Sequence, residues 1–354
     1  MDGPRSGAGG SEQLRRFRLF ADLTVVATFA LIVLGGIVRV SESGLGCGPG
    51  GSGTEGWPLC NGEAIPFFHN TEVIVEFSHR TLAAIVTALI AVLVWTAYRH
   101  LRELRWPLRL SLVAAGLVLV QAALGGLTVE KSLAEELVAA HLGLAMILIG
   151  LLLWIGVRAR AELAASKPGE GPKPSSAAPV RGLKPFAAAA AVLLLCAIVA
   201  GGYVAGTEEE GIHGSGKNIA GAHMACGEQF PGCLNQGIAP FGVSRLSDIH
   251  LTHRMFVYAT TFAILLLLGV AWRRGARSPL MATALGLLVV QVALGALNVV
   301  LEEHAALIVA HLIIATLLWS TLLLIAYTLA WSPAPALARS PAGRKARSAA
   351  TAEA

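Results

Sequence analysis

Four histidines lie inside strongly apolar stretches of the chain. An ionisable side chain is energetically costly there, so its presence indicates a function. The four histidines are His79, His141, His253 and His311. The first two lie about two turns into their stretches, at similar depth, on segments that can face each other across a helical bundle. Such a pair is typical of a haem held by two axial histidines. One isolated histidine would more often bond a neighbouring helix, but four at repeated positions favour haem, and zinc usually takes four nitrogen or sulfur ligands.

One carboxylate stands beside these histidines in the first half of the chain only. Glu76 precedes His79 by three residues, so both side chains lie on one face of a helix, roughly 5–6 Å apart between Cβ atoms. The equivalent position in the second half is His250. A carboxylate in partly apolar surroundings could act as a base or proton relay. The alternative is a structural ion pair with Arg80 or Arg39.

Each half also carries one pair of cysteines in a loop. The pairs are Cys47 with Cys60 and Cys226 with Cys233, whereas Cys196 lies alone in an apolar stretch and is interpreted as a packing residue. A compartment outside the cytoplasm permits disulfides, and the repetition of a pair in each half favours bridging. The bridges could be staples of the loops or redox-active dithiols, and the sequence leaves both interpretations open.

The elements that must position these side chains are eight apolar segments. The chain is 55% hydrophobic and only 14% charged, whereas an average soluble domain carries roughly 25% charge. Because lipid leaves no water for unpaired backbone groups, an all-α membrane protein with eight transmembrane helices is expected. The predicted helices span approximately 20–40, 73–97, 108–128, 136–157, 186–206, 249–272, 279–300 and 305–329.

The eight segments divide into two similar halves. Ser78–His79–Arg80 recurs as Thr252–His253–Arg254, and the Gln121-to-His141 and Gly35–Gly36 motifs recur at Gln291-to-His311 and Gly201–Gly202. Each half has an even number of spans, so both insert in the same direction, which predicts two four-helix bundles related by a pseudo-two-fold axis along the membrane normal. The expected divisions are an N-terminal tail (1–19), an N-terminal half (20–160), a Pro- and Ser-rich linker (161–185), a C-terminal half (186–330) and a C-terminal tail (331–354).

The basic residues predict an orientation in the membrane. Lys and Arg number 27 against 22 Asp and Glu. Most of the Lys and Arg residues lie before the first span, after the last span, or in the linkers that follow the second, fourth and sixth spans. By the positive-inside rule, both termini are expected in the cytoplasm and the cysteine loops outside it, in a multi-pass protein of the cell membrane. No nucleic-acid partner is expected.

The run from Gly35 to Arg80 resembles the signature of the heme A synthase family. It is carried by Gly35–Gly36–Ile–Val–Arg39, Ser43–Gly44–Leu45, Trp57–Pro58–Leu59–Cys60–Asn61–Gly62 and Glu76–Phe–Ser–His79–Arg80. The repeated Gln-to-His blocks extend the resemblance over the whole chain. The sequence departs from the family in the first loop, where the Gly-rich segment 48–56 separates the two cysteines.

The resemblance implies an enzyme that oxidises the C8 methyl of haem O to the formyl group of haem A for terminal oxidase assembly. It implies that His79 and His141 flank the substrate haem, that His253 and His311 ligate a haem B cofactor, and that Glu76 takes part in catalysis. The implied partners are haem O, the lipid bilayer, the farnesyltransferase that forms haem O, and oxidase assembly factors. Two other functions remain open: a bis-His cytochrome b that only carries electrons, and a haem-handling or transport protein.

Overall fold

The structure, a computed structural model, describes residues 7–68, 70–165, 182–207, 221–301 and 304–330. These residues form eight helices, each long and apolar enough to cross a membrane, and contain no β-strand. The eight-helix, all-α prediction is confirmed. The helices are α1 (Gly7–Val40), α2 (Thr71–His100), α3 (Arg105–Glu130), α4 (Glu135–Ala165), α5 (Lys184–Gly206), α6 (Arg245–Arg273), α7 (Pro279–Val300) and α8 (Ala305–Ala330).

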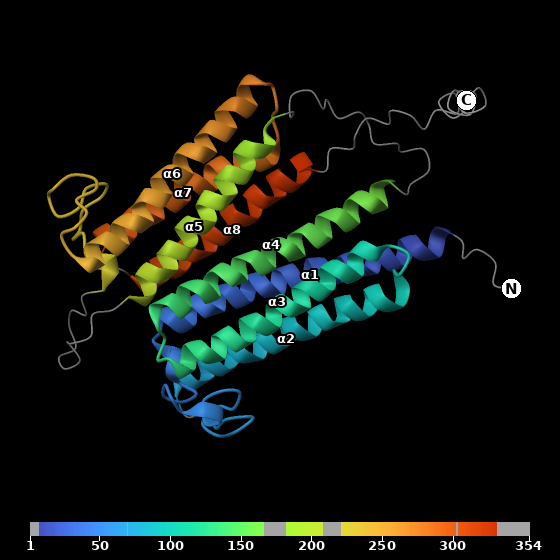
Figure 1. Ribbon diagram of the computed structural model, residues 1–354, viewed down its shortest axis with the longest axis horizontal. Helices are drawn as coiled ribbons and strands as arrows, with labels where there is room; N and C mark the ends of the chain where they lie inside the picture. The colour runs from blue at the N-terminus through green and yellow to red at the C-terminus, as the bar shows by residue number, and fades with distance from the viewer. Residues whose placement is uncertain (1–6, 69, 166–181, 208–220, 302–303, 331–354) are drawn as a thin grey trace, which may run out of the picture.

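The helices form two four-helix groups that lie side by side (Figure 1). Within the first group each helix contacts the next and α1 contacts α4, so that α2 and α4 stand across the bundle from each other. The second group has the same arrangement, which places α6 across from α8. The groups meet where α4 contacts α5 and α8, and where α1 contacts α8.

Two contacts of the same kind join the groups. A Cβ on Gly36 of α1 would lie 2.5 Å from Cδ2 of Leu312 on α8, and one on Gly202 of α5 would lie 3.0 Å from Cδ2 of Leu142 on α4. Each leucine directly follows a candidate haem histidine. The second glycine of each Gly–Gly pair therefore lets the other group approach closely.

The first helix begins earlier than predicted. The sequence pattern predicted a start near residue 20, but α1 begins at Gly7. Hydropathy marks only the part of a helix that suits lipid, whereas the first turns of α1 are polar and are supported by Glu12, which pairs with Arg15 and Arg16 at 2.9 Å. Phe17, part of the same extension, is fully buried in the core of the first group.

The cysteine-bearing loops lie at one end of the molecule, opposite the end where α1 begins and α8 finishes (Figure 1). Because both loops precede the second helix of their group, they lie close to the predicted positions of His79 and His253 along the helix axes. The candidate site of each group is therefore near its loop-bearing end.

Candidate haem sites and the loops above them

Each candidate histidine packs against a glycine on the preceding helix. A Cβ built on that glycine would lie within 3.0–3.2 Å of the Cε1 atom of the imidazole, which is tighter than an ordinary van der Waals contact. The pairs are Gly35 with His79, Gly125 with His141, Gly201 with His253, and Gly295 with His311. The four imidazoles therefore have the same local packing, and a larger residue at any of these glycines would displace the ring.

Each candidate histidine has at least one ring nitrogen for which the structure shows no hydrogen bond to a described residue. The Nδ1 atoms of His79, His141 and His311 are shielded from solvent and have no hydrogen-bond partner among the described residues. Unpaired buried polar atoms are uncommon and costly, by about 1–3 kcal/mol each. In His253, Nδ1 lies 2.9 Å from the carbonyl oxygen of Ala197, a contact that leaves Nε2 for a metal.

These residues fit a haem in each group. Neutral imidazole is a common axial ligand of haem iron, and each group offers two imidazoles from helices that stand across its bundle. The described residues hold no cluster of three or more His, Cys, Asp or Glu side chains suited to another metal ion. The paired histidines are therefore the donor set on which a metal-containing group would depend.

The Gln and His residues that recur at the same spacing in the two halves make different contacts. Gln121 donates from Nε2 to the backbone oxygen of His141 at 2.8 Å. Gln291 instead has its Nε2 3.0 Å from Nε2 of the His311 ring. If His311 binds iron through that nitrogen, the Gln291 amide turns aside.

Glu76 is buried, with its side chain only 5% exposed, and both of its oxygens are engaged. One oxygen accepts a hydrogen bond from Arg80, and the other accepts from the backbone N–H of Cys47 at 2.7 Å. The ion pair with Arg80 considered from the sequence is thus present, whereas Arg39 donates to the carbonyl of Ala205 at 2.9 Å. Glu76 links the helix of His79 to the first cysteine of the loop.

Both predicted cysteine pairings are present as disulfides. Cys47 joins Cys60 across a separation of 13 residues, and Cys226 joins Cys233 across 7. The Gly-rich segment 48–56 is accommodated by a short helical turn, Gly53–Glu55, and does not prevent the first bridge. All four cysteines are at most 1% exposed, so the bridges lie inside the folded loops, while Cys196 is free.

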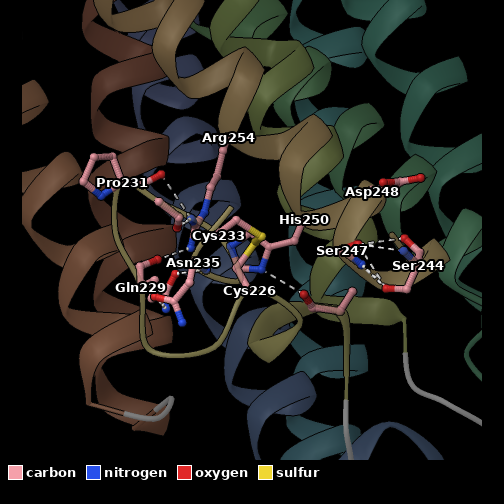
Figure 2. Close-up of a disulfide and its surroundings, with 12 residues drawn as sticks. Cys226, Gln229, Pro231, Cys233, Asn235, Ser244, Ser247, Asp248, His250 and Arg254 are labelled. Carbon is pink, nitrogen blue, oxygen red and sulfur yellow. Dashed lines mark hydrogen bonds between the residues drawn. A yellow bond between two sulfur atoms is a disulfide. The ribbon is translucent and has the colours of Figure 1, made fainter. Parts of the chain in front are cut away.

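An arginine anchors each disulfide loop to the helix below it. Arg80 donates from Nη1 to the carbonyl oxygens of Gly56 and Leu59, both at 2.7 Å. Arg254 donates from Nη1 to Gly232 at 2.6 Å and from Nη2 to Gln229 at 2.8 Å (Figure 2). Each arginine directly follows a candidate haem histidine. The loop is therefore attached to the helix at the residue next to that histidine.

The model of the family described as COX15-CtaA, cytochrome oxidase assembly protein, matches residues 18–323. The match begins within α1, ends within α8, and includes the six helices between them and every candidate site residue. The chain belongs to the COX15-CtaA family. It is a multi-pass membrane protein of that family.

Relatives within the COX15-CtaA family carry the name heme A synthase. The chain is 28% identical to the heme A synthase of Halalkalibacterium halodurans over 258 residues, which cover 73% of this chain and 76% of that protein. It is 27% identical to the heme A synthase of Alkalihalophilus pseudofirmus over the same shares of both chains. A shorter match of 128 residues is 34% identical to the heme A synthase of Staphylococcus aureus strain Newman and covers 35% of this chain and 40% of that protein.

Two features of this COX15-CtaA protein were missed by the sequence analysis. The glycines that face the histidines entered the prediction only as repeats. Arg80 was considered only as an ion-pair partner of Glu76 and Arg254 only as part of a repeated motif, so the anchoring of the loops by both arginines was not predicted. Their positions carried a signal, because Gly35, Gly201, Arg80 and Arg254 all recur at matching places in the two halves. The pattern could not say what they contact, since this depends on how the helices are rotated and how the loops fold.

Proposed function

We propose that the protein is a heme A synthase, a membrane oxidoreductase that oxidises the C8 methyl of haem O to the formyl group of haem A for terminal oxidase assembly. The observation that carries the proposal is the buried carboxylate of Glu76, one turn from His79, in only one of two similar histidine pairs. The family and the names of its relatives support the same reaction.

In this proposal the first group binds the substrate. His79 and His141 flank the iron of haem O from opposite sides of the bundle, and Gly35 and Gly125 set the position of each ring by close packing. Two fixed imidazoles would hold the iron and the plane of the macrocycle in one place, while rotation about the axis through the iron would be limited by the side chains around the ring edge.

Glu76 is proposed to receive protons that the methyl group loses. Conversion of the methyl group and one water to a formyl group releases four protons, two from the methyl and two from the water, and four electrons, which an external oxidant must accept. The site therefore needs a proton acceptor close to the haem edge. A carboxylate oxygen has two lone pairs; Arg80 donates to one oxygen of Glu76, and the Cys47 amide donates to the other. Arg80 and the amide hold Glu76 in place while capacity for a proton remains.

The second group is proposed to hold a haem B cofactor through His253 and His311. When bound, haem B supplies one-electron transfer. The Ala197 carbonyl fixes the orientation of the His253 ring through Nδ1, and Gly201 and Gly295 limit the movement of the two imidazoles. The second group has no carboxylate at the position of Glu76, which supports a role in electron transfer without proton removal.

The disulfides are proposed to be staples of the loops. Each bridge is buried and packs on an apolar residue of the next helix, with Val73 beside the first bridge and Leu251 beside the second. A buried bridge is poorly placed to exchange with external thiols. This observation favours the structural interpretation over the redox-active one.

We place the protein in the cell membrane with both termini in the cytoplasm and the cysteine loops outside. The positions of the basic residues support this orientation. The proposed partners are the lipid bilayer, the farnesyltransferase that forms haem O and the oxidase assembly factors that receive haem A.

Pigment extraction and chromatography of the purified protein test the function. A heme A synthase is expected to contain haem A, or a hydroxylated intermediate between haem O and haem A, together with haem B. A membrane cytochrome b would contain haem B alone, and a transport protein would release only the haem that was supplied. Either of the last two results, in cells that make haem O, would contradict the proposed function.

A further inference from the structure

The charge next to the haem ligand differs between the two groups, although the anchoring of the loops is the same. Arg80 and Arg254 both donate to carbonyl oxygens of a disulfide loop. Arg80 also donates to the carboxylate of Glu76, which forms an ion pair with it. Among the described residues, Arg254 has no carboxylate partner, because the position equivalent to Glu76 is His250.

Arg254 is held in a buried position by neutral groups. It is only 3% exposed, and its guanidinium contacts the carbonyl oxygens of Gln229, Pro231 and Gly232 (Figure 2). The guanidinium also lies 5.8 Å from the centre of the Phe230 ring. These dipoles and the ring stabilise the cation but leave its net charge in place, since arginine stays protonated in proteins.

His250 cannot neutralise that charge. Its Nδ1 lies 2.8 Å from the carbonyl oxygen of Ala222, so the side chain ties α6 to the short helical turn Ala222–Met224 at the start of the loop. An imidazole in this position supplies a hydrogen bond in place of the carboxylate, without the negative charge.

We infer that the residue at the position of Glu76 and His250 sets the reduction potentials of the two haem sites apart, and that the charge of Arg254, which pairs with no carboxylate among the described residues, holds the second-group haem at the higher potential. This inference rests on the proposed ligation by His253, which is adjacent to Arg254 in the chain. A buried cation favours the reduced haem, which carries one positive charge less than the oxidised haem. Next to His79, the Glu76 carboxylate offsets the same effect of Arg80.

The test is a spectroelectrochemical titration of the low-spin haem in the purified, full-length protein. His250→Glu would give the second group the ion pair that the first group has. We expect its reduction equilibrium to move about tenfold toward the oxidised form, a fall of ~59 mV in the midpoint of a one-electron couple. His250→Gln has similar bulk and keeps a hydrogen-bond donor but adds no charge, so its midpoint is expected to match the wild type.

A second pair of variants answers the question if His250→Glu loses haem. Arg254→Lys keeps the charge and Arg254→Gln removes it, so only Arg254→Gln is expected to lower the midpoint. Equal midpoints for His250→Glu and His250→Gln, or for Arg254→Gln and Arg254→Lys, would overturn the inference. Wild-type protein without a bis-His low-spin haem would instead contradict the proposed function, which is measured first on the same preparation.

Discussion

The two four-helix groups repeat the parts that we propose to hold a haem and differ in the part that we propose to carry out chemistry on one. Both have two histidines that pack on glycines, an arginine that anchors a disulfide loop, and a buried disulfide. They differ at one buried position, which is Glu76 in one group and His250 in the other. Under the proposed function, the duplicated bundle keeps its binding geometry in both copies, while the charge at this position separates their roles.

Removal of a proposed axial imidazole is expected to have the largest effect, because it should remove the haem from one group and not from the other. His253→Ala or His311→Ala should abolish the tightly bound second-group haem, because the iron loses a ligand outright. The control is His304→Ala at an exposed position, which should leave the haem in place. The low-spin absorption spectrum of the purified protein measures the outcome, and an unchanged spectrum in His253→Ala would sink the ligand assignment.

Loss of the Glu76 charge is expected to reduce turnover with little effect on haem binding. Glu76→Gln keeps the volume of the side chain, and we expect a fall in haem A formation of roughly 10²-fold or more, because a positioned proton acceptor contributes that much. Haem O or a partly oxidised product should accumulate in cells that depend on the protein. His250→Ala, at the matching position, should slow conversion far less.

Full haem A production by Glu76→Gln would show that the difference between the groups is not catalytic. Equal losses in Glu76→Gln and His250→Ala would show that both groups contribute to the reaction in the same way. Chromatography of extracted haems distinguishes these results, and the haem content of each variant corrects for protein that fails to insert.

A methyl group added next to an imidazole is expected to have a smaller effect. In Gly295→Ala the new Cβ would lie 3.2 Å from the His311 ring, whereas in Gly286→Ala, on the same helix, it would meet nothing within 4 Å. Overpacking costs about 1–3 kcal/mol, so Gly295→Ala should release haem about tenfold more readily. Gly286→Ala should only strengthen the helix, by up to about 1 kcal/mol. Similar haem retention in both variants would refute the packing role of Gly295.

Each disulfide is expected to raise the free energy of unfolding of its group by the amount typical of a native disulfide. Mass spectrometry without reduction should show Cys47 linked to Cys60 and Cys226 linked to Cys233, with Cys196 free. Replacement of either pair by serine should lower the free energy of unfolding of its group by about 2–4 kcal/mol, which thermal unfolding with and without reductant would reveal. A free thiol at Cys60 in protein isolated under oxidising conditions would count against the first bridge.

The sequence was sufficient to predict the helices, since a long apolar segment has few alternatives in lipid. It was also sufficient to predict the cysteine pairs, because each pair recurs in a short loop. It could not predict the start of α1 at Gly7, where the first turns are polar and carry no hydropathy signal. Nor could it predict that Gly125 meets His141 or that Arg254 reaches the Gln229 carbonyl, because both contacts depend on helix rotation and loop folding.

The central claim, that the first group takes the substrate haem and the second keeps the cofactor, is tested most directly by haem stoichiometry in cells with and without a supply of haem O. Without haem O, the purified protein should retain one low-spin haem B, which is lost in His253→Ala and kept in His79→Ala. With haem O, the wild type should gain a second haem, and His79→Ala should not. Retention of haem B in His253→Ala together with its loss in His79→Ala would contradict the assignment of the two groups.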